Sequence, residues 1–167
     1  MSRYSMRSAP DYMPRKALRE IQNERFLKTF RHVFANVAWY RNLLEEHRVS
    51  PDSIKSIDDL PKLPFIKKTD LRDTYPDGMF AAPKSEIIRY HASSGTTGKP
   101  IVIGSTQNDI DTWYESVARA LTAFGVDEND VLQVAFGYGL FTGGLGLHGG
   151  GEARGCSVVP ISGGNTE

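Results

Sequence analysis

The sequence has little of what marks secreted, membrane-spanning or nucleic-acid-binding proteins. Its 167 residues include one cysteine, Cys156, so no disulfide can form within the chain, which favours a reducing compartment. The 20 basic residues are balanced by 20 acidic ones, which gives no reason to expect nucleic acid or an anionic membrane as a partner. No apolar run approaches the ~20 residues of a membrane span, and the first residues lack the apolar stretch of a secretion signal. We therefore expect a cytoplasmic protein.

Glycine is also scarce at first and then abundant. No glycine precedes Gly78, and most of the 16 glycines follow residue 136. Backbone that approaches a ligand closely or takes a positive φ needs glycine, so the segment 136–151 is interpreted as lying near a ligand. Cys156 follows in an apolar stretch that we interpret as a buried strand, which favours a core thiol over a nucleophile. The chain closes on the loop-like segment 163–167, so we expect its last domain to be incomplete.

Residues 1–80 are expected to form a helical lead-in and linker. Apolar residues recur at steps of three and four over 15–37, which predicts an amphipathic helix whose first turn follows Pro14. A second short helical stretch runs to His47, and a proline-punctuated linker follows. Within it, Thr69 is predicted to cap a turn that begins at the next residue.

Residues 81–167 are expected to be the start of an α/β domain. The pattern predicts strands over 87–90 and 101–103, a helix over 107–123 capped by Thr106, a buried strand over 131–135, and a last strand over 157–161. A glycine-rich, helix-like crossover separates the last two strands. This alternation is typical of an α/β layer fold.

One loop between two predicted strands carries the most specific chemistry. It consists of Ser93, Ser94, Gly95, Thr96, Thr97, Gly98 and Lys99. Glycines let backbone N–H groups turn toward one point and form a concavity that binds anions. The hydroxyls can donate to phosphate oxygens or help coordinate magnesium, and the lysine adds positive charge. The loop therefore predicts a phosphate site at a sheet end.

This loop has two alternative interpretations. A Walker A loop fails because Pro100 stands where Ser or Thr should follow the lysine, and Ser93 stands where the first glycine should be. A flexible hairpin turn is the plainer alternative. No cluster of His, Cys and carboxylates has convincing metal-ligand spacing, so no metal site is assigned to protein side chains.

Several segments, in order, resemble one family of enzymes. Residues 90–100 resemble the phosphate-binding motif of adenylate-forming enzymes, and the form His-Ala-Ser-Ser is similar to the phenylacetate–CoA ligase branch. Further stretches resemble the same branch at 36–41, 60–76, 136–146 and 160–167. The chain is therefore identified as the amino-terminal portion of such a ligase, with the beginning of its large amino-terminal α/β domain.

The resemblance implies a reaction in two steps. ATP and an aryl carboxylic acid, phenylacetate, would give an acyl-adenylate and diphosphate, and coenzyme A would then displace AMP, as part of phenylacetate catabolism. The loop 93–99 would hold the β- and γ-phosphates, with Mg²⁺ as cofactor. The lysine used for adenylation is supplied by a carboxy-terminal domain outside this chain, so Lys99 is not that lysine and no catalytic residue is assigned.

The acid pocket is expected near the glycine-rich segment. Tyr138, Phe141 and Gly143 are the candidates, because flat apolar rings can line a slot for a phenyl group; ordinary core residues are the alternative. Gly149 departs from the family, which usually carries tyrosine there, and this predicts a looser pocket wall. His91 is expected to make a structural hydrogen bond at a strand end.

Two other functions stay open beside the ligase. One is a stand-alone nucleotide- or phosphate-binding module without catalysis. The other is an adenylate-forming enzyme for a different carboxylic acid. A homodimer is left open.

Overall fold

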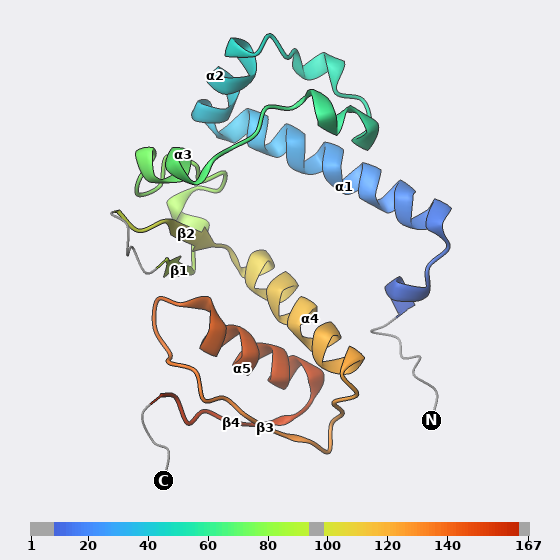
Figure 1. The fold of residues 1–167 in the computed structure, drawn as a ribbon, viewed down its shortest axis with the longest axis vertical. Helices are drawn as coiled ribbons and strands as arrows, with labels where there is room; N and C mark the ends of the chain where they lie inside the picture. The colour runs from blue at the N-terminus through green and yellow to red at the C-terminus, as the bar shows by residue number, and fades with distance from the viewer. Residues whose placement is uncertain (1–8, 94–98, 164–167) are drawn as a thin grey trace.

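The computed structural model describes residues 9–93 and 99–163, with a helical first part followed by a part built from two helices and short strands (Figure 1). The first part consists of η1 (Ala9–Tyr12), α1 (Arg15–Asn36), α2 (Ala38–Glu46), η2 (Pro51–Ser53), η3 (Ile57–Lys62), α3 (Lys68–Asp73) and η4 (Lys84–Glu86). The second part consists of β1 (Arg89–Ala92), β2 (Val102–Ser105), α4 (Gln107–Ala123), β3 (Val131–Gln133), α5 (Thr142–Arg154) and β4 (Ser157–Val159). None of the described helices is long and apolar enough to cross a membrane.

The two predicted helices of the lead-in are confirmed and share one core. Val37 ends α1 in an extended conformation, with φ −109° and ψ 98°, and it also precedes the first residue of α2. This break lets α2 fold back so that apolar residues of both helices meet. Buried in that core are Phe30, Val37, Tyr40, Leu44 and Ile54. Burial of this apolar surface stabilises the lead-in.

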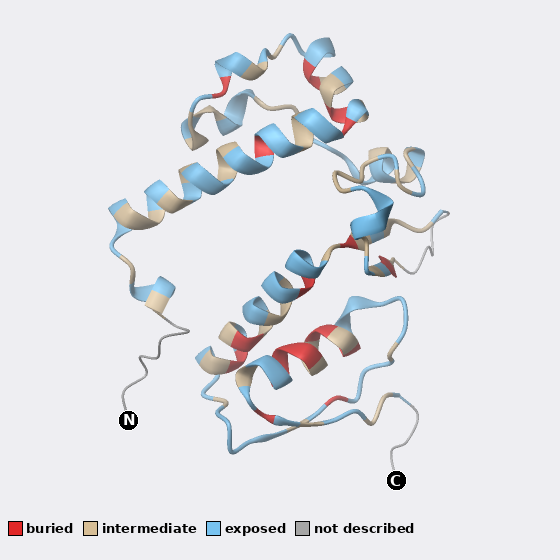
Figure 2. Ribbon diagram, turned by 180° about the vertical axis from the view of Figure 1, so that it is seen from behind, coloured by how far each residue is buried: buried red, intermediate tan, exposed pale blue. Residues whose placement is uncertain are grey.

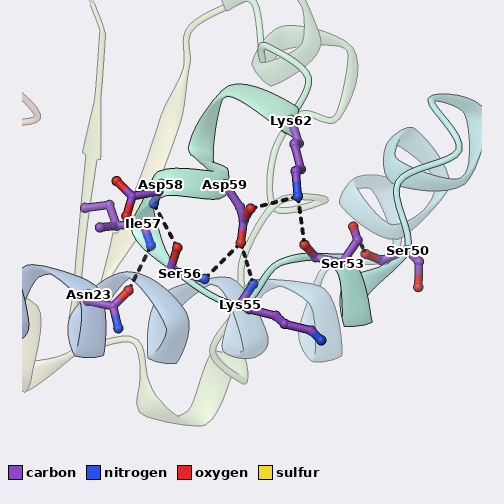
Figure 3. A network of polar contacts seen from close by, with 9 residues as sticks. All are labelled: Asn23, Ser50, Ser53, Lys55, Ser56, Ile57, Asp58, Asp59 and Lys62. Carbon is purple, nitrogen blue, oxygen red and sulfur yellow. Dashed lines mark hydrogen bonds and ion pairs between the residues drawn. The ribbon is translucent and has the colours of Figure 1, made fainter.

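A carboxylate organises the linker after α2 (Figure 3). Asp59 accepts hydrogen bonds from the backbone N–H groups of Lys55, at 2.8 Å, and Ser56, at 3.0 Å, and pairs with the ammonium of Lys62 at 2.7 Å. The hydrogen bond from Lys62 and then those two backbone donors lower the pKa of Asp59 to about 2. The side-chain oxygen of Asn23 accepts the N–H of Ile57 at 2.8 Å, which ties the linker to α1.

The predicted cap at Thr69 is wrong, because α3 begins at Lys68, two residues before the predicted first residue. The carboxylate of Asp70 accepts the backbone N–H of Lys67 at 2.6 Å. That bond satisfies a donor ahead of the first turn, so Lys67 is the N-cap residue and Thr69 lies inside the helix.

The described strands form two separate pairs and no larger sheet. β1 and β2 are antiparallel, with Arg89 opposite Ser105 and Ala92 opposite Val102. β3 and β4 are parallel and α5 connects them, as in a βαβ unit. The prediction of a buried strand over 131–135 is wrong in extent, because β3 ends at Gln133 and Val131 is 67% exposed. Only the neighbouring Val134 is fully buried, at 1% exposure.

The predicted helix over 107–123 is confirmed, including its cap. The Thr106 hydroxyl accepts the N–H of Asp109 at 3.3 Å, and the Asp109 carboxylate accepts the N–H of Thr106 at 2.8 Å. The chain turns after α4 at Gly125, whose φ of +90° favours glycine. The predicted core thiol is also confirmed: Cys156 is buried and its Sγ donates to the Asp127 carbonyl at 3.3 Å.

Truncating the lead-in core should destabilise the chain. Leu44 is 0% exposed, so Leu44→Ala should lower the free energy of unfolding by about 2–5 kcal/mol through lost burial and the cavity left behind. Leu60, which is 52% exposed, provides the control, and Leu60→Ala should cost well under half as much. Urea unfolding of both variants measures the difference, and equal losses would contradict the assigned core.

Candidate nucleotide and acid site

The predicted phosphate loop leaves β1 and returns into β2. Ser93 and Ile101, which are hydrogen-bonded to each other, form the neck of this loop. The N–H of Ser93 donates to the Ile101 carbonyl, and the N–H of Ile101 donates to the Ser93 hydroxyl, each at 2.9 Å. The other predicted residues Ser94, Gly95, Thr96, Thr97 and Gly98 lie outside the described residues. The Ser93 hydroxyl therefore closes the base of the loop and keeps a second lone pair for another partner.

Lys99 lies at the far end of the same loop, next to the lead-in. Its side chain is exposed, and its ammonium lies 6.0 Å from the centroid of the Tyr75 ring, at the outer limit of a cation–π contact. Tyr75 of the lead-in therefore lies near Lys99, at the end of the predicted phosphate loop.

The segment between β3 and α5 is fastened to β1. The backbone N–H of Ala92 donates to the Leu140 carbonyl at 2.9 Å, and Nδ1 of His91 lies 3.1 Å from the same oxygen. The predicted structural hydrogen bond of His91 is thus confirmed. Because Leu140 precedes Phe141, this contact brings the predicted acid segment to the neck of the predicted phosphate loop.

Tyr138 is engaged by α5. Its hydroxyl lies 3.1 Å from Nδ1 of His148, and the two rings meet edge to face. Nε2 of His148 lies 3.2 Å from a carboxylate oxygen of Glu152, one helical turn further on. Burial and then the charge of Glu152 raise the pKa of Tyr138 above its ordinary value. These contacts were not predicted from the sequence. A helix over 142–154 places His148 and Glu152 four residues apart on the same face, and this spacing is the signal that could have revealed their pairing.

Phe141 and Gly143 lie at the beginning of α5. Phe141 is the N-cap residue and is 57% exposed, so it is not an ordinary core residue. A Cβ on Gly143 would lie 3.5 Å from the Phe136 ring, which is normal contact. The described residues also line a cleft of about 950 Å³ between α1 and β2, with Lys28, His32, Phe80, Ile103 and Asp109 in its wall, and the three acid-site candidates lie outside that wall.

Later glycines of α5 serve close helix packing, in the part of this helix that Figure 2 colours as buried, whereas the ligand approach expected at Gly137, Gly139 and Gly143 stays a prediction. A Cβ on Gly146 would lie 2.4 Å from Trp113, and one on Gly150 would lie 2.3 Å from Val117, both on α4. One on Gly151 would lie 2.7 Å from Leu132. These glycines are buried because α4 and β3 lie directly against the helix backbone.

The looser wall expected at Gly149 is not found. A Cβ there would lie 2.2 Å from the Tyr114 ring, so an aromatic ring from α4 already fills the space. The Tyr114 hydroxyl accepts a hydrogen bond from the Arg89 guanidinium at 2.7 Å, which holds the ring in place. Within the described ranges, no three His, Cys, Asp or Glu side chains are grouped so that they could hold a metal ion.

Comparison with solved structures gives the class of the protein. A 2-hydroxyisobutyryl-CoA ligase, in complex with 2-HIB-AMP and CoA in the thioesterification state, superposes on 98% of this chain with a TM-score of 0.88 and 28% identity. An open conformation of that ligase, with the same two ligands, gives a TM-score of 0.87 and 27% identity. The chain covers 35% and 38% of those two proteins. The fold is therefore that of the amino-terminal part of adenylate-forming ligases.

Comparison with curated sequences shows that this chain is similar over most of its length to phenylacetate–coenzyme A ligases. The phenylacetate–coenzyme A ligase of Thermus thermophilus is 55% identical over 155 residues, and that of Pseudomonas putida is 54% identical over 151 residues. That of Escherichia coli K12 is 51% identical over 150 residues. Over at least 90% of its length, this chain is similar to an amino-terminal portion of phenylacetate–CoA ligases. These matches cover at least 90% of this chain and 34–35% of each relative, so the chain spans about a third of their length. No family model matches the chain.

Adding a methyl group at Gly149 should destabilise the chain. Gly149→Ala should cost about 1–3 kcal/mol of unfolding free energy, because the Tyr114 ring has to move. Gly143→Ala in the same helix is the matched control and should be neutral or stabilising by up to about 1 kcal/mol. In a Tyr114→Ala background the penalty at Gly149 should vanish. Thermal unfolding of the full double-mutant cycle measures this, and an unchanged penalty would refute the assigned contact.

The raised pKa of Tyr138 should appear in the pH dependence of stability. The fold favours the neutral phenol, so this contribution is complete below the ordinary pKa of about 10 and is lost as pH rises through the raised value. Unfolding free energy should therefore fall more steeply with pH in the wild type than in Tyr138→Phe. Glu152→Gln should bring the titration of the tyrosinate absorbance closer to about 10. Identical pH profiles for wild type and Tyr138→Phe would argue against the effect.

Proposed function

We propose that this chain is the phosphate- and acid-binding portion of an ATP-dependent aryl-acid–CoA ligase. The reaction converts phenylacetate, ATP and coenzyme A into phenylacetyl-CoA, AMP and diphosphate through an acyl-adenylate. The observation that carries the proposal is the 51–55% identity to four phenylacetate–CoA ligases. The solved ligases with a bound acyl-AMP and CoA support the adenylate chemistry.

In this proposal the loop 93–99 holds the β- and γ-phosphates of ATP. The closed neck between Ser93 and Ile101 supports it, because donors must be held in place before charge develops on the diphosphate leaving group. Lys99 adds positive charge at the exit of the loop. Magnesium is an oxygen-binding ion, and the free lone pair of the Ser93 hydroxyl fits it. When bound, the ion would neutralise negative charge on the phosphate oxygens.

The acid lies in this proposal against the segment between β3 and α5. Phe141 is exposed at the beginning of α5, so its ring is accessible to a phenyl group. Tyr138 contributes the face of its ring, because its hydroxyl already faces His148. Gly143, beside the Phe136 ring in the first turn of α5, completes the proposed acid pocket.

The proposal also covers the location, the metabolic role and the domain organisation of the protein. The protein acts in the cytoplasm, in phenylacetate catabolism, and residues 1–80 and 81–167 are its two units within this chain. The homodimer stays a prediction.

A different carboxylic acid is the second candidate, because the solved neighbours at 26–28% identity are 2-hydroxyisobutyryl-CoA ligases. Against it stands the higher identity to phenylacetate–CoA ligases. The two acids differ in shape and polarity, so turnover of one over the other separates the candidates.

Joining residues 1–167 to the remaining part of the Thermus thermophilus ligase should give an active enzyme. We expect phenylacetyl-CoA formation within about tenfold of the parent rate, which corresponds to a barrier raised by no more than about 1.4 kcal/mol by the new junction. Release of AMP and of the thioester is followed with phenylacetate and, in parallel, with 2-hydroxyisobutyrate.

Two controls frame this experiment. The first control measures ATP binding to the 167-residue chain alone by calorimetry. A stand-alone binding module would bind ATP in this measurement and would give an inactive chimera. The parent ligase fixes the rate scale. A folded chimera that turns over neither acid would refute the proposal, and turnover of 2-hydroxyisobutyrate alone would replace phenylacetate.

A further inference from the structure

The Leu140 carbonyl receives two donors from the strand that leads into the phosphate loop. Ala92 donates its backbone N–H at 2.9 Å, and Nδ1 of His91 lies at 3.1 Å. Leu140 lies 49 positions further along the chain than His91. A single peptide oxygen thus joins two segments that are distant in sequence.

The surroundings of His91 fix how it makes this contact. The side chain is 2% exposed and its ring meets Trp113 of α4 edge to face at 5.3 Å. Its Nε2 is buried and has no hydrogen-bond partner among the described residues. A proton on Nδ1 serves the Leu140 carbonyl, whereas a proton on Nε2 would leave a buried donor unpaired there. The contacts therefore fit a neutral imidazole that donates through Nδ1.

The position of the contact gives it a role beyond filling the core. His91 lies two residues before Ser93, which closes the neck of the phosphate loop, and Leu140 lies directly before Phe141. Trp113 in turn packs over Gly146 of α5, so the ring of His91 is held by the same helix pair that carries the acid segment. The buried His91 side chain is therefore in contact with both segments, beside the backbone bond of Ala92.

We propose that His91 is a positioning residue that couples the acid site to the nucleotide site by holding the Leu140 carbonyl. The inference rests on the proposed function, which assigns the two joined segments to phosphate and acid. Adenylation requires the carboxylate oxygen to meet phosphorus while diphosphate leaves. Such a geometry tolerates little displacement, and an error of about 1 Å can cost about a hundredfold in rate.

Two substitutions separate the donor from the bulk of the side chain. In His91→Asn the side-chain nitrogen lies as many bonds from Cβ as Nδ1 does, so the donor to Leu140 is kept. In His91→Gln the nitrogen lies at the reach of Nε2, so that donor is lost. His47→Gln is the matched control, because His47 is exposed and its Nδ1 lies 2.9 Å from the Leu43 carbonyl, one turn back in α2.

The first measurement uses the 167-residue chain and needs no activity. Amide hydrogen exchange of Ala92, which donates to the same carbonyl, should speed up about tenfold in His91→Gln and stay within about threefold in His91→Asn and His47→Gln, as expected for one lost hydrogen bond. If His91→Gln loses secondary structure by circular dichroism, His91→Phe replaces it, since it keeps the ring contact with Trp113 without the donor. Unchanged exchange of Ala92 would overturn the link.

The second measurement uses the chimeric ligase and tests coupling. The KM for phenylacetate is measured at low and at saturating ATP, and their ratio reports how strongly one substrate promotes binding of the other. His91→Gln should bring this ratio close to one and lower kcat/KM at least about tenfold, while His91→Asn should retain both. A wild-type chimera without activity defeats the proposed function and leaves the exchange result to decide the link. An active chimera whose ratio is untouched by His91→Gln overturns the coupling.

Discussion

The direct contact between α4 and the backbone of α5 is the constraint on which the rest of the second half depends. Side chains of α4 occupy the space that Cβ atoms of Gly146, Gly149 and Gly150 would take. Each glycine inside a helix costs about 1 kcal/mol of helix propensity relative to alanine, and the close packing of Trp113 and Tyr114 offsets that cost. Because α5 cannot move away from α4, the segment ahead of it arrives beside β1.

Polar contacts then fix what this packing brings together. The Leu140 carbonyl joins the proposed acid segment to β1, and the Ser93–Ile101 pair closes the proposed phosphate loop between β1 and β2. Tyr138 is held from the other side by His148. Each contact is worth about 1 kcal/mol alone, and together they favour the arrangement seen here of the proposed phosphate loop and the proposed acid segment. This is the pre-organisation that a reaction between two bound substrates needs.

Sequence patterns correctly predicted the features that depend on interactions between neighbouring residues. The periodicity of 15–37 and the cap at Thr106 gave the helices correctly, since both depend on neighbours within a turn. Thr69 was misjudged because Asp70 offered a competing bond to the preceding backbone. The division into two strand pairs, the packing role of the glycines and the Leu140 contact depend on residues far apart in sequence, so no single segment revealed them. The phosphate-loop motif itself was recognised from resemblance, and its residues 94–98 lie outside the described part of the chain.

Gly149 and Tyr114 show why a motif should be judged with its neighbours. Taken alone, glycine at a position where the family usually carries tyrosine implies a hole. The Tyr114 ring removes that hole, and the 2.2 Å approach leaves no room for a second ring. A tyrosine at 149 therefore requires a smaller residue at 114, and glycine at 149 permits the ring to come from α4. Positions 149 and 114 therefore form one packing unit, in which added volume at one position has to be accommodated at the other. The Arg89 guanidinium donates to the Tyr114 hydroxyl. This hydrogen bond connects the packing unit to β1, the strand that leads into the proposed phosphate loop.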